Sequence, residues 1–195
     1  MSGQMVPHTA AEAAWLVVVD PQVIFADPAS EWASPEFDAA MDVIEAVAPS
    51  FDGRVVVTRW LPTASRMTEV GEPTSWTDYF EAWPFADMPA TDPLYDLVPR
   101  ARALTDRPTV DSPTFGKWGE DLRAVVGEAP RLVLTGVSTD CCVITTALAA
   151  ADAGAHVEVL TDGCAGSTAE DGAAALRVMG LFDPQIRLRS SADLL

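Results

Sequence analysis

Short apolar runs alternate with segments of helical periodicity along this chain. Residues 15–19 are apolar throughout, whereas the apolar residues within 36–48 recur every three or four positions. Across the whole sequence this pattern predicts strands at 15–19, 54–58, 107–110, 132–134, 156–160 and 186–188, and helices at 36–48, 118–126, 141–153 and 167–179. Strands that alternate with helices are typical of right-handed β–α–β units and a largely parallel sheet.

The alternation predicts a three-layer α/β/α fold of Rossmann-like type, with a mostly parallel six-stranded sheet between two layers of helices. The chain has 195 residues, the size of one domain, so we expect a single domain over 1–195. Hydrophobic residues make up 49% of the chain, which excludes a disordered protein. Residues 1–14 are expected to be a loose lead-in.

The segment 60–99 departs from this alternation. It holds aromatic residues among prolines and acids, with little periodicity. A long irregular segment inside a compact domain is usually functional, so we expect a lid or a pocket wall here. Its residues Trp76, Phe80, Trp83 and Phe85 are equally compatible with an oligomer interface or with ordinary core packing.

The charge of the chain excludes two classes of partner. The formal net charge is -17 and there is no basic run, which argues against binding nucleic acid or an anionic membrane surface. No apolar run is long enough to span a bilayer, and the first residues lack the pattern of a secretory signal. Three cysteines, two of them adjacent, do not suit a disulfide framework. We therefore expect a cytoplasmic protein with reduced thiols.

Cys141 and Cys142 follow a predicted strand and a turn, and they begin an apolar segment of helix length. The positive end of a helix dipole can lower the pKa of a cysteine and favour its thiolate, which is the nucleophilic form. Backbone amides at the same place can bind an oxyanion. The alternative is that both cysteines are ordinary core residues.

Two more polar residues follow predicted strands. Asp20 ends the first strand, and Lys117, the only lysine, comes after the third. The carboxyl ends of parallel strands form ligand sites in open α/β sheets, so we expect Asp20, Lys117 and Cys142 to lie close together. The ordinary alternatives are a strand-ending aspartate and a solvated surface lysine.

Three segments resemble the cysteine hydrolases of the isochorismatase-like superfamily, to which nicotinamidases and N-carbamoylsarcosine amidases belong. Residues 17–25 resemble the first strand with its Asp-x-Gln-x-x-Phe signature, 136–143 the nucleophile segment, and 162–165 the end of the fifth strand. The resemblance runs in order along nearly the whole chain. It implies hydrolysis of a small amide, carbamoyl or imide substrate through an acyl-enzyme, without a cofactor.

The resemblance also implies a role for each residue. Asp20 would be the general base and Cys142 the nucleophile, and the backbone amides of Ser138 and Cys142 would form the oxyanion hole. A cis peptide bond would precede Ser138. The lysine of the family usually precedes a Ser-x-Phe element, whereas Lys117 follows Phe115. We assign Lys117 to the triad because it is the only lysine.

If Lys117 points away from the site, Arg107 is the next candidate for the positive charge. Phe25, Trp60 and Trp118 lie near strand ends and are predicted to contact the substrate. Arg59 is a candidate partner for a substrate carboxylate, and it could equally pair with one of the 29 acidic residues of the chain.

No metal is expected in this chain. Metal-binding nicotinamidases carry an Asp-x-His element after the second strand, and residues 58–62 lack a histidine. The two histidines of the chain, His8 and His156, do not have the spacing of metal ligands.

Several alternatives remain at this stage. An isochorismatase-type vinyl-ether hydrolase shares the fold and does not need the cysteine. A non-catalytic α/β binding protein would hold the same residues as core features. A redox pair formed by Cys141 and Cys142 is disfavoured, because adjacent cysteines close a strained ring and lack the spacing of redox pairs. Family members suggest a homodimer or homotetramer, with a small-molecule substrate as the expected partner.

Overall fold

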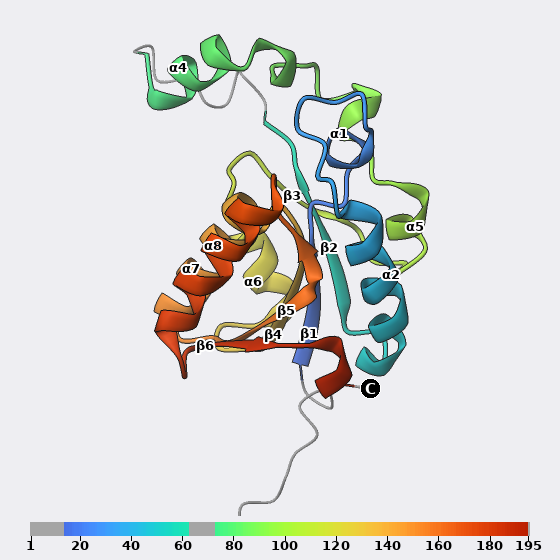
Figure 1. The fold of residues 1–195 in the computed structure, drawn as a ribbon, viewed down its shortest axis with the longest axis vertical. Helices are drawn as coiled ribbons and strands as arrows, with labels where there is room; N and C mark the ends of the chain where they lie inside the picture. Colours follow the sequence, from blue (N-terminus) through green and yellow to red (C-terminus); the bar gives the residue numbers. More distant parts are fainter. Residues whose placement is uncertain (1–13, 63–72, 195) are drawn as a thin grey trace, which may run out of the picture.

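The structure, a computed structural model, describes residues 14–62 and 73–194. Most of the predicted lead-in lies outside the described residues. Six parallel strands form one sheet in the order β3-β2-β1-β4-β5-β6 (Figure 1). The strands are β1 (Ala14–Val19), β2 (Val55–Trp60), β3 (Val110–Ser112), β4 (Arg131–Val137), β5 (His156–Ala165) and β6 (Ile186–Arg189). This confirms the predicted six-stranded α/β fold.

Helices cover both faces of the sheet (Figure 1). On one face lies α2 (Phe37–Val47), and on the other lie α6 (Glu120–Val126), α7 (Ile144–Asp152) and α8 (Ala169–Met179). The shorter helices are α1 (Val23–Ala26), α4 (Ser75–Ala82) and α5 (Pro99–Arg102), with single turns at Ala48–Phe51, Pro84–Ala86, Pro93–Tyr95, Thr139–Val143, Gly180–Phe182 and Ser191–Asp193. None of the helices in the described ranges is long and apolar enough to cross a membrane.

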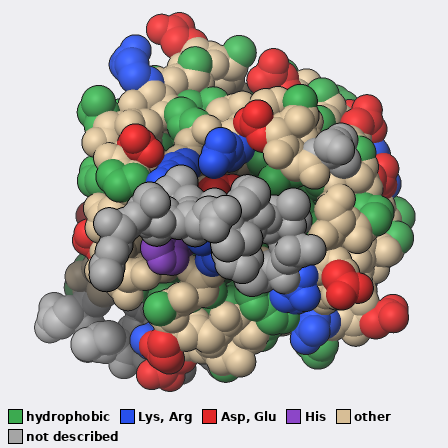
Figure 2. All heavy atoms as spheres, turned by 90° about the horizontal axis from the view of Figure 1, so that it is seen from below, with side chains coloured by type: hydrophobic (Ala, Val, Ile, Leu, Met, Phe, Trp, Pro, Cys, Tyr) green, Lys and Arg blue, Asp and Glu red, His purple; other side chains and the backbone are tan. Residues whose placement is uncertain are grey.

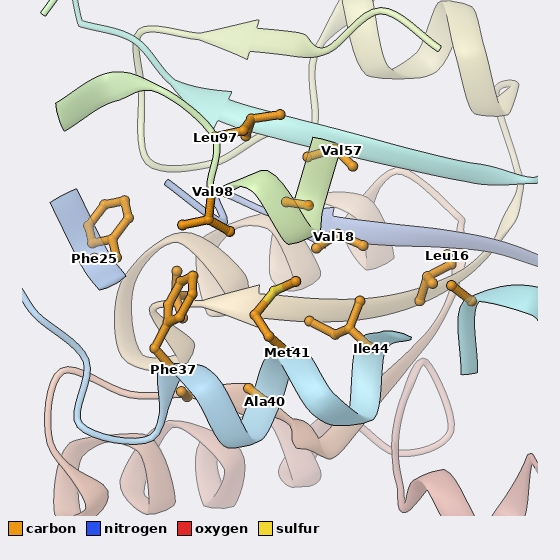
Figure 3. Close-up of a cluster of buried hydrophobic side chains, with 14 of the residues drawn as sticks. Leu16, Val18, Phe25, Phe37, Ala40, Met41, Ile44, Val57, Leu97 and Val98 are labelled. Carbon is orange, nitrogen blue, oxygen red and sulfur yellow. The ribbon is translucent and has the colours of Figure 1, made fainter. Parts of the chain in front are cut away.

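The core lies on both sides of the sheet because side chains alternate along each strand. In β1, Leu16 and Val18 face α2 and pack with Met41 and Ile44 (Figure 3). Val17 and Val19 face the opposite side of the sheet and join the second core, with α6, α7 and α8. β1 is therefore buried on both faces, which explains its continuous apolar run. Figure 2 shows the surface of the molecule from below. On this surface the acidic side chains are spread around the margin and form no single patch.

The predicted elements hold except at two places. β3 begins at Val110, the last residue of the predicted strand 107–110, because Pro108 lacks the N–H that a strand ladder needs. The predicted helix 141–153 begins with a wide π-type turn, in which Ser138 O accepts the N–H of Val143 at 3.1 Å. The regular helix α7 starts only at Ile144. Within the irregular segment 60–99, α4 is a short helix, and residues 63–72 lie outside the described part.

The strand order reverses between β1 and β4. From β1 the chain continues outward through β2 and β3, and from β4 it continues to the opposite edge through β5 and β6. At such a reversal the following loops diverge, and the crevice between them is the usual ligand site of open α/β sheets. The residues after β1 and after β4, beginning with Asp20 and Ser138, therefore border the same crevice.

Gly136 allows the ends of β1 and β4 to approach closely. It pairs with Val19 and has φ +104°, a conformation that favours glycine. A Cβ at this position would lie 2.1 Å from Val19 O, which the packed strands cannot accommodate. The close approach of these two strand ends brings Asp20 near the turn that carries Cys142.

Replacing Gly136 with alanine should therefore destabilise the protein by more than about 3 kcal/mol, through the backbone clash and the positive φ. The matched control is Gly119→Ala, because a Cβ at Gly119 meets no atom within 4 Å, and its expected cost is below about 1 kcal/mol. Urea unfolding followed by fluorescence measures both losses. Equal stability of the two variants would contradict this reading of the β1–β4 contact.

Candidate active site

Asp20 and Lys117 form a buried ion pair. Lys117 Nζ lies 3.0 Å from Asp20 Oδ2, and both side chains are 0% exposed. Thr58 Oγ1 donates a hydrogen bond to Asp20 Oδ1 at 2.7 Å, and Lys117 Nζ donates to Thr114 O at 2.7 Å. A buried pair costs desolvation energy, which only close contact and further hydrogen bonds offset. Each charge here has both.

The second oxygen of Asp20 is free of hydrogen bonds. Within the described residues Asp20 Oδ2 faces the Lys117 ammonium as an ion pair but accepts no hydrogen bond of good geometry. Asp20 also has φ 47°, which is uncommon for a residue other than glycine and is found most often at functional sites. Asp20 therefore presents a buried oxygen that can take a proton.

One hydroxyl ties the lysine segment to the cysteine turn. Thr146 Oγ1 accepts a hydrogen bond from Lys117 N at 2.9 Å and donates one to Cys142 O at 2.6 Å. The side chain of Thr146 is fully buried on the first turn of α7. It fixes the backbones of Lys117 and Cys142 relative to each other, although 24 residues separate them in the sequence.

Cys142 is buried, and its thiol is held in the protonated form. A hydrogen bond with Cys141, burial and the negative charge of Asp20 raise its pKa above the ordinary value, while Lys117 acts in the opposite direction. The hydrogen bond from Cys142 lowers the pKa of the half-buried Cys141. The pKa of Cys142 is therefore raised and not lowered as its place at a helix end suggested, because the hydrogen bond with Cys141, burial and the Asp20 charge all favour the thiol.

The turn after β4 has the cis peptide bond that the family resemblance implies, between Val137 and Ser138. Ser138 O accepts the N–H groups of Cys141 and Val143, both at 3.1 Å, and so shapes the turn. The roles of the Ser138 and Cys142 amides in an oxyanion hole remain predictions at this point.

Gln22 is a structural residue of the site that sequence reasoning missed. Its amide nitrogen donates to Trp60 O at 2.9 Å and to Tyr95 O at 2.8 Å, and its oxygen accepts from Trp60 N at 2.8 Å. It joins the end of β1 to the end of β2 and to the loop around Tyr95. The signal was present, since Gln22 is a polar residue two positions after Asp20 within the first-strand signature.

A cavity of about 490 Å³ opens above Cys142. Two predicted substrate-binding residues, Phe25 and Trp60, line it. So do Trp32 and Tyr79, which sequence reasoning did not single out. The described lining residues are Phe25, Glu31, Trp32, Ala33, Trp60, Tyr79, Trp83, Phe115, Ser138, Asp140, Cys141, Cys142, Ser167 and Thr168.

The structure does not bring Arg59 and Trp118 to this cavity, which corrects the prediction that both contact the substrate. Arg59 neighbours Trp60 on β2, and adjacent strand residues face opposite sides. Its guanidinium pairs with Asp111, with Nε 2.8 Å from Oδ1. Trp118 packs against the core around α6 and α7.

Other predicted candidates are also placed away from the site. Arg107 donates to Gly53 O at 3.3 Å and lies over the Trp15 ring, near the opposite ends of the strands, so it does not replace Lys117. In the segment 60–99, Trp83 lines the cavity. Trp76, Phe80 and Phe85 do not line the cavity themselves but pack against rings that do. Their ring centroids lie 4.8 Å from Phe115, 5.7 Å from Tyr79 and 4.9 Å from Trp32, respectively.

The residues at the end of β2 do not suit the metal site of metal-binding nicotinamidases. At this place Trp60 is apolar and buried, and Arg59 is committed to Asp111. Within the described ranges, no group of three or more His, Cys, Asp or Glu side chains is arranged to hold a metal ion.

Removing one partner of the ion pair should be costly. Lys117→Met leaves the Asp20 carboxylate buried without its counter-ion, and the expected loss of stability is about 3–5 kcal/mol. The double variant Asp20→Asn/Lys117→Met should lose clearly less than the sum of the two single losses, because no charge is left unpaired. Chemical unfolding of all four proteins measures the coupling. Additive losses would show that the two groups do not stabilise each other.

The three thiols should differ in reactivity. The thiolate is the reactive form, so near neutral pH iodoacetamide should modify Cys141 first and Cys142 more slowly. Burial, with the charge of Asp162, raises the pKa of Cys164 to about 12, so this thiol should remain protonated and unmodified at all pH values well below that. Peptide mass mapping over a pH series measures the order. Early modification of Cys164 would contradict the described burial.

The isochorismatase-domain family model matches residues 14–189 of this chain. No curated protein sequence matches this chain. Among solved structures, a cysteine hydrolase from Pseudomonas syringae pv. phaseolicola 1448A is similar, with a TM-score of 0.75 and 17% identity, over 100% of this chain and 96% of that one.

Two further solved structures share the fold. PnC1 from L. infantum, in complex with nicotinate, has a TM-score of 0.70 and 21% identity, over 97% of this chain and 98% of that one. Pyrazinamidase of Pyrococcus horikoshii, in complex with zinc, has a TM-score of 0.65 and 24% identity, over 91% and 99%. Because the family model spans nearly the whole described chain, this protein belongs to the isochorismatase family of hydrolases.

Proposed function

We propose that this protein hydrolyses a small amide, carbamoyl or imide substrate through Asp20, Lys117 and Cys142. The observation that carries the proposal is the buried Asp20–Lys117 ion pair, whose free carboxylate oxygen lies at the reversal of the sheet. Cys142 lies on the turn that borders the same crevice and lines the cavity. A base, a positive charge and a thiol in one water-poor place suit nucleophilic catalysis.

In the first step Asp20 Oδ2 takes the proton of the Cys142 thiol. This base is needed because Cys142 is held as a thiol. The positive charge of Lys117 stabilises the developing thiolate. The sulfur then attacks the carbonyl carbon of the substrate, and the N–H groups of Ser138 and Cys142 stabilise the resulting oxyanion by several kcal/mol, as in comparable sites.

In the second step the carboxylic acid of Asp20 gives its proton to the leaving nitrogen. The C–N bond breaks, the amine or ammonia departs, and the acyl group remains on Cys142 as a thioester. Asp20 then takes a proton from a water molecule, which attacks the thioester. The acid product leaves, and the sulfur returns as a thiol.

The similar proteins support a carbon–nitrogen bond as the target. One is a pyrazinamidase, and PnC1 binds nicotinate. A vinyl-ether hydrolase on the same fold does not need Cys142. A non-catalytic binding protein has no turnover, and Asp20, Lys117 and Cys142 would then be core residues only. The variants described below separate these alternatives.

Three wider predictions accompany the proposal. The first is a cytoplasmic location with reduced thiols, for which the free Cys141, Cys142 and Cys164 are suited. A single domain without a cofactor is sufficient for the proposed reaction. A homodimer or homotetramer remains a prediction, which light scattering of the purified protein can test. The exposed apolar residues of α8, β6 and the turn between them are the first place to look for a contact; these are Val178, Leu181, Phe182 and Leu188.

Cys142→Ala should lower amide turnover at least about 1000-fold, because the covalent step is lost. Asp20→Asn should cause a loss of similar size. Cys164→Ser is the matched control and should retain activity, because this buried thiol is not part of the cavity lining. Ammonia release from a panel of small amides and ureido compounds measures turnover.

Mass spectrometry of the rapidly quenched enzyme should find the acyl group on the peptide that contains Cys142. Full turnover by Cys142→Ser would instead favour chemistry without a thioester. No turnover of any compound by the parent protein would contradict the proposed amide hydrolysis and leave the vinyl-ether hydrolase and the binding protein.

A further inference from the structure

Six of the described residues that line the cavity are aromatic, and their rings form an aromatic wall. Trp32 is at the centre of this wall. Its ring centroid lies 5.3 Å from that of Trp60, 6.1 Å from Tyr79 and 5.9 Å from Trp83, and it stacks on Phe25 at 6.3 Å. The sixth ring, Phe115, stacks on Trp60 at 6.0 Å. Trp32 is nearly parallel to Phe25, with 6° between their planes, and is inclined to Trp60, Tyr79 and Trp83 by 51°, 46° and 61°.

The charged groups of the cavity are negative. The charged residues among its described lining are Glu31 and Asp140, and none of that lining is lysine or arginine. Asp140 is held in place by Ser167, whose N–H and hydroxyl donate to its two oxygens at 2.8 and 2.6 Å. Glu31 is exposed and forms no ion pair with a described residue.

Among the described residues, the two cations beside this part of the fold, Lys117 and Arg59, are not available to a substrate. The side chain of Lys117 is 0% exposed and already binds Asp20 and Thr114. Arg59 is paired with Asp111 and does not line the cavity. A substrate carboxylate would lose its hydration here and gain no counter-ion among the described residues, which is costly.

A positively charged group of a substrate is instead attracted to this cavity. Aromatic faces attract cations within about 6 Å of the ring centroid, and the attraction strengthens when the cation is desolvated. Glu31 and Asp140 add Coulomb attraction, and the net charge of -17 raises the local concentration of cations. An alkylated ammonium group is weakly hydrated and combines charge with apolar surface, so it matches both features of the wall.

We propose that the cavity selects a small amide whose acyl part carries an alkylated ammonium group, and that it rejects amides that carry a carboxylate. The hydrolytic part of this inference rests on the function proposed above, whereas the recognition of the cation does not. The reaction is unchanged in its balance: the amide C–N bond breaks, water supplies the hydroxyl, and the ammonium nitrogen takes no part. The product would be an ammonium carboxylate.

Three probe amides of similar size test the charge preference. They are trimethylammonioacetamide, which is cationic, its neutral isostere 3,3-dimethylbutanamide, and malonamate, which is anionic. We expect kcat/KM for the cation to exceed that for the neutral isostere at least about 10-fold, and the anion to be the poorest substrate. Equal rates for cation and isostere, or a preference for the anion, would overturn the inference.

Variants of the wall locate the preference. Trp32→Leu removes the central ring, and Glu31→Gln removes one charge. Each should reduce the ratio of kcat/KM for the cation to kcat/KM for the isostere several-fold. Glu36→Gln is the matched control for charge, because Glu36 is exposed and does not line the cavity, and it should leave the ratio unchanged. If Trp32→Leu does not fold, Glu31→Gln still decides, since an unaltered ratio in this variant counts against the inference.

A binding measurement separates this inference from the proposed function. Calorimetric titration of Cys142→Ser with the cation and with its isostere measures recognition without turnover. Tighter binding of the cation, together with no hydrolysis of any amide by the parent protein, would support the inference and remove the proposed chemistry. Hydrolysis of all three amides without charge preference in rate or binding would support the proposed hydrolysis and overturn the inference of cation recognition.

Discussion

The Asp20 carboxylate and the Lys117 ammonium lie 3.0 Å apart with no exposed surface, and the site depends on this contact. Two charges in a buried place are costly unless several elements hold them together. Here Asp20 extends from β1 and is bonded by Thr58 of β2, while Lys117 is bonded by Thr114 and, through its backbone, by Thr146 of α7. The ion pair therefore links four parts of the fold, namely β1, β2, the loop after β3 and α7, and Thr146 also bonds the backbone of Cys142.

The sheet order explains why the site lies where it does. Only β1 and β4 are central strands whose connections leave in opposite directions, so only their ends border an open crevice. Gly136 narrows the distance between these ends, and the wide turn at 139–143 places Cys142 over the crevice floor. The aromatic wall is then added from outside the sheet, mainly by segments that follow β1 and β2 (Figure 1).

Much of this arrangement could be predicted from sequence because it follows from periodicity and from strand ends. Asp20, Lys117 and Cys142 each follow a predicted strand, and that rule places them at one edge of a parallel sheet. Gln22, Thr58 and Thr146 were not foreseen, because their roles depend on partners at least 29 residues away in the sequence. Arg59 was misplaced because one residue of register decides which face of β2 a side chain occupies. The raised pKa of Cys142 was not foreseen, because it depends first on the hydrogen bond with Cys141 and on burial, and the sequence shows neither of these.

The cavity has two walls of different origin. The reactive wall is fixed by strand ends, buried hydrogen bonds and a glycine that tolerates no side chain. The aromatic wall takes Trp32 from the loop after α1, Tyr79 from α4 and Phe115 from the loop after β3. Phe115 belongs to the segment that also holds Lys117, whereas the segments of Trp32 and Tyr79 can exchange their rings without changing the residues of the ion pair. Altered selectivity in an evolving or engineered descendant would thus be expected to arise in the loops, with the reacting groups left in place.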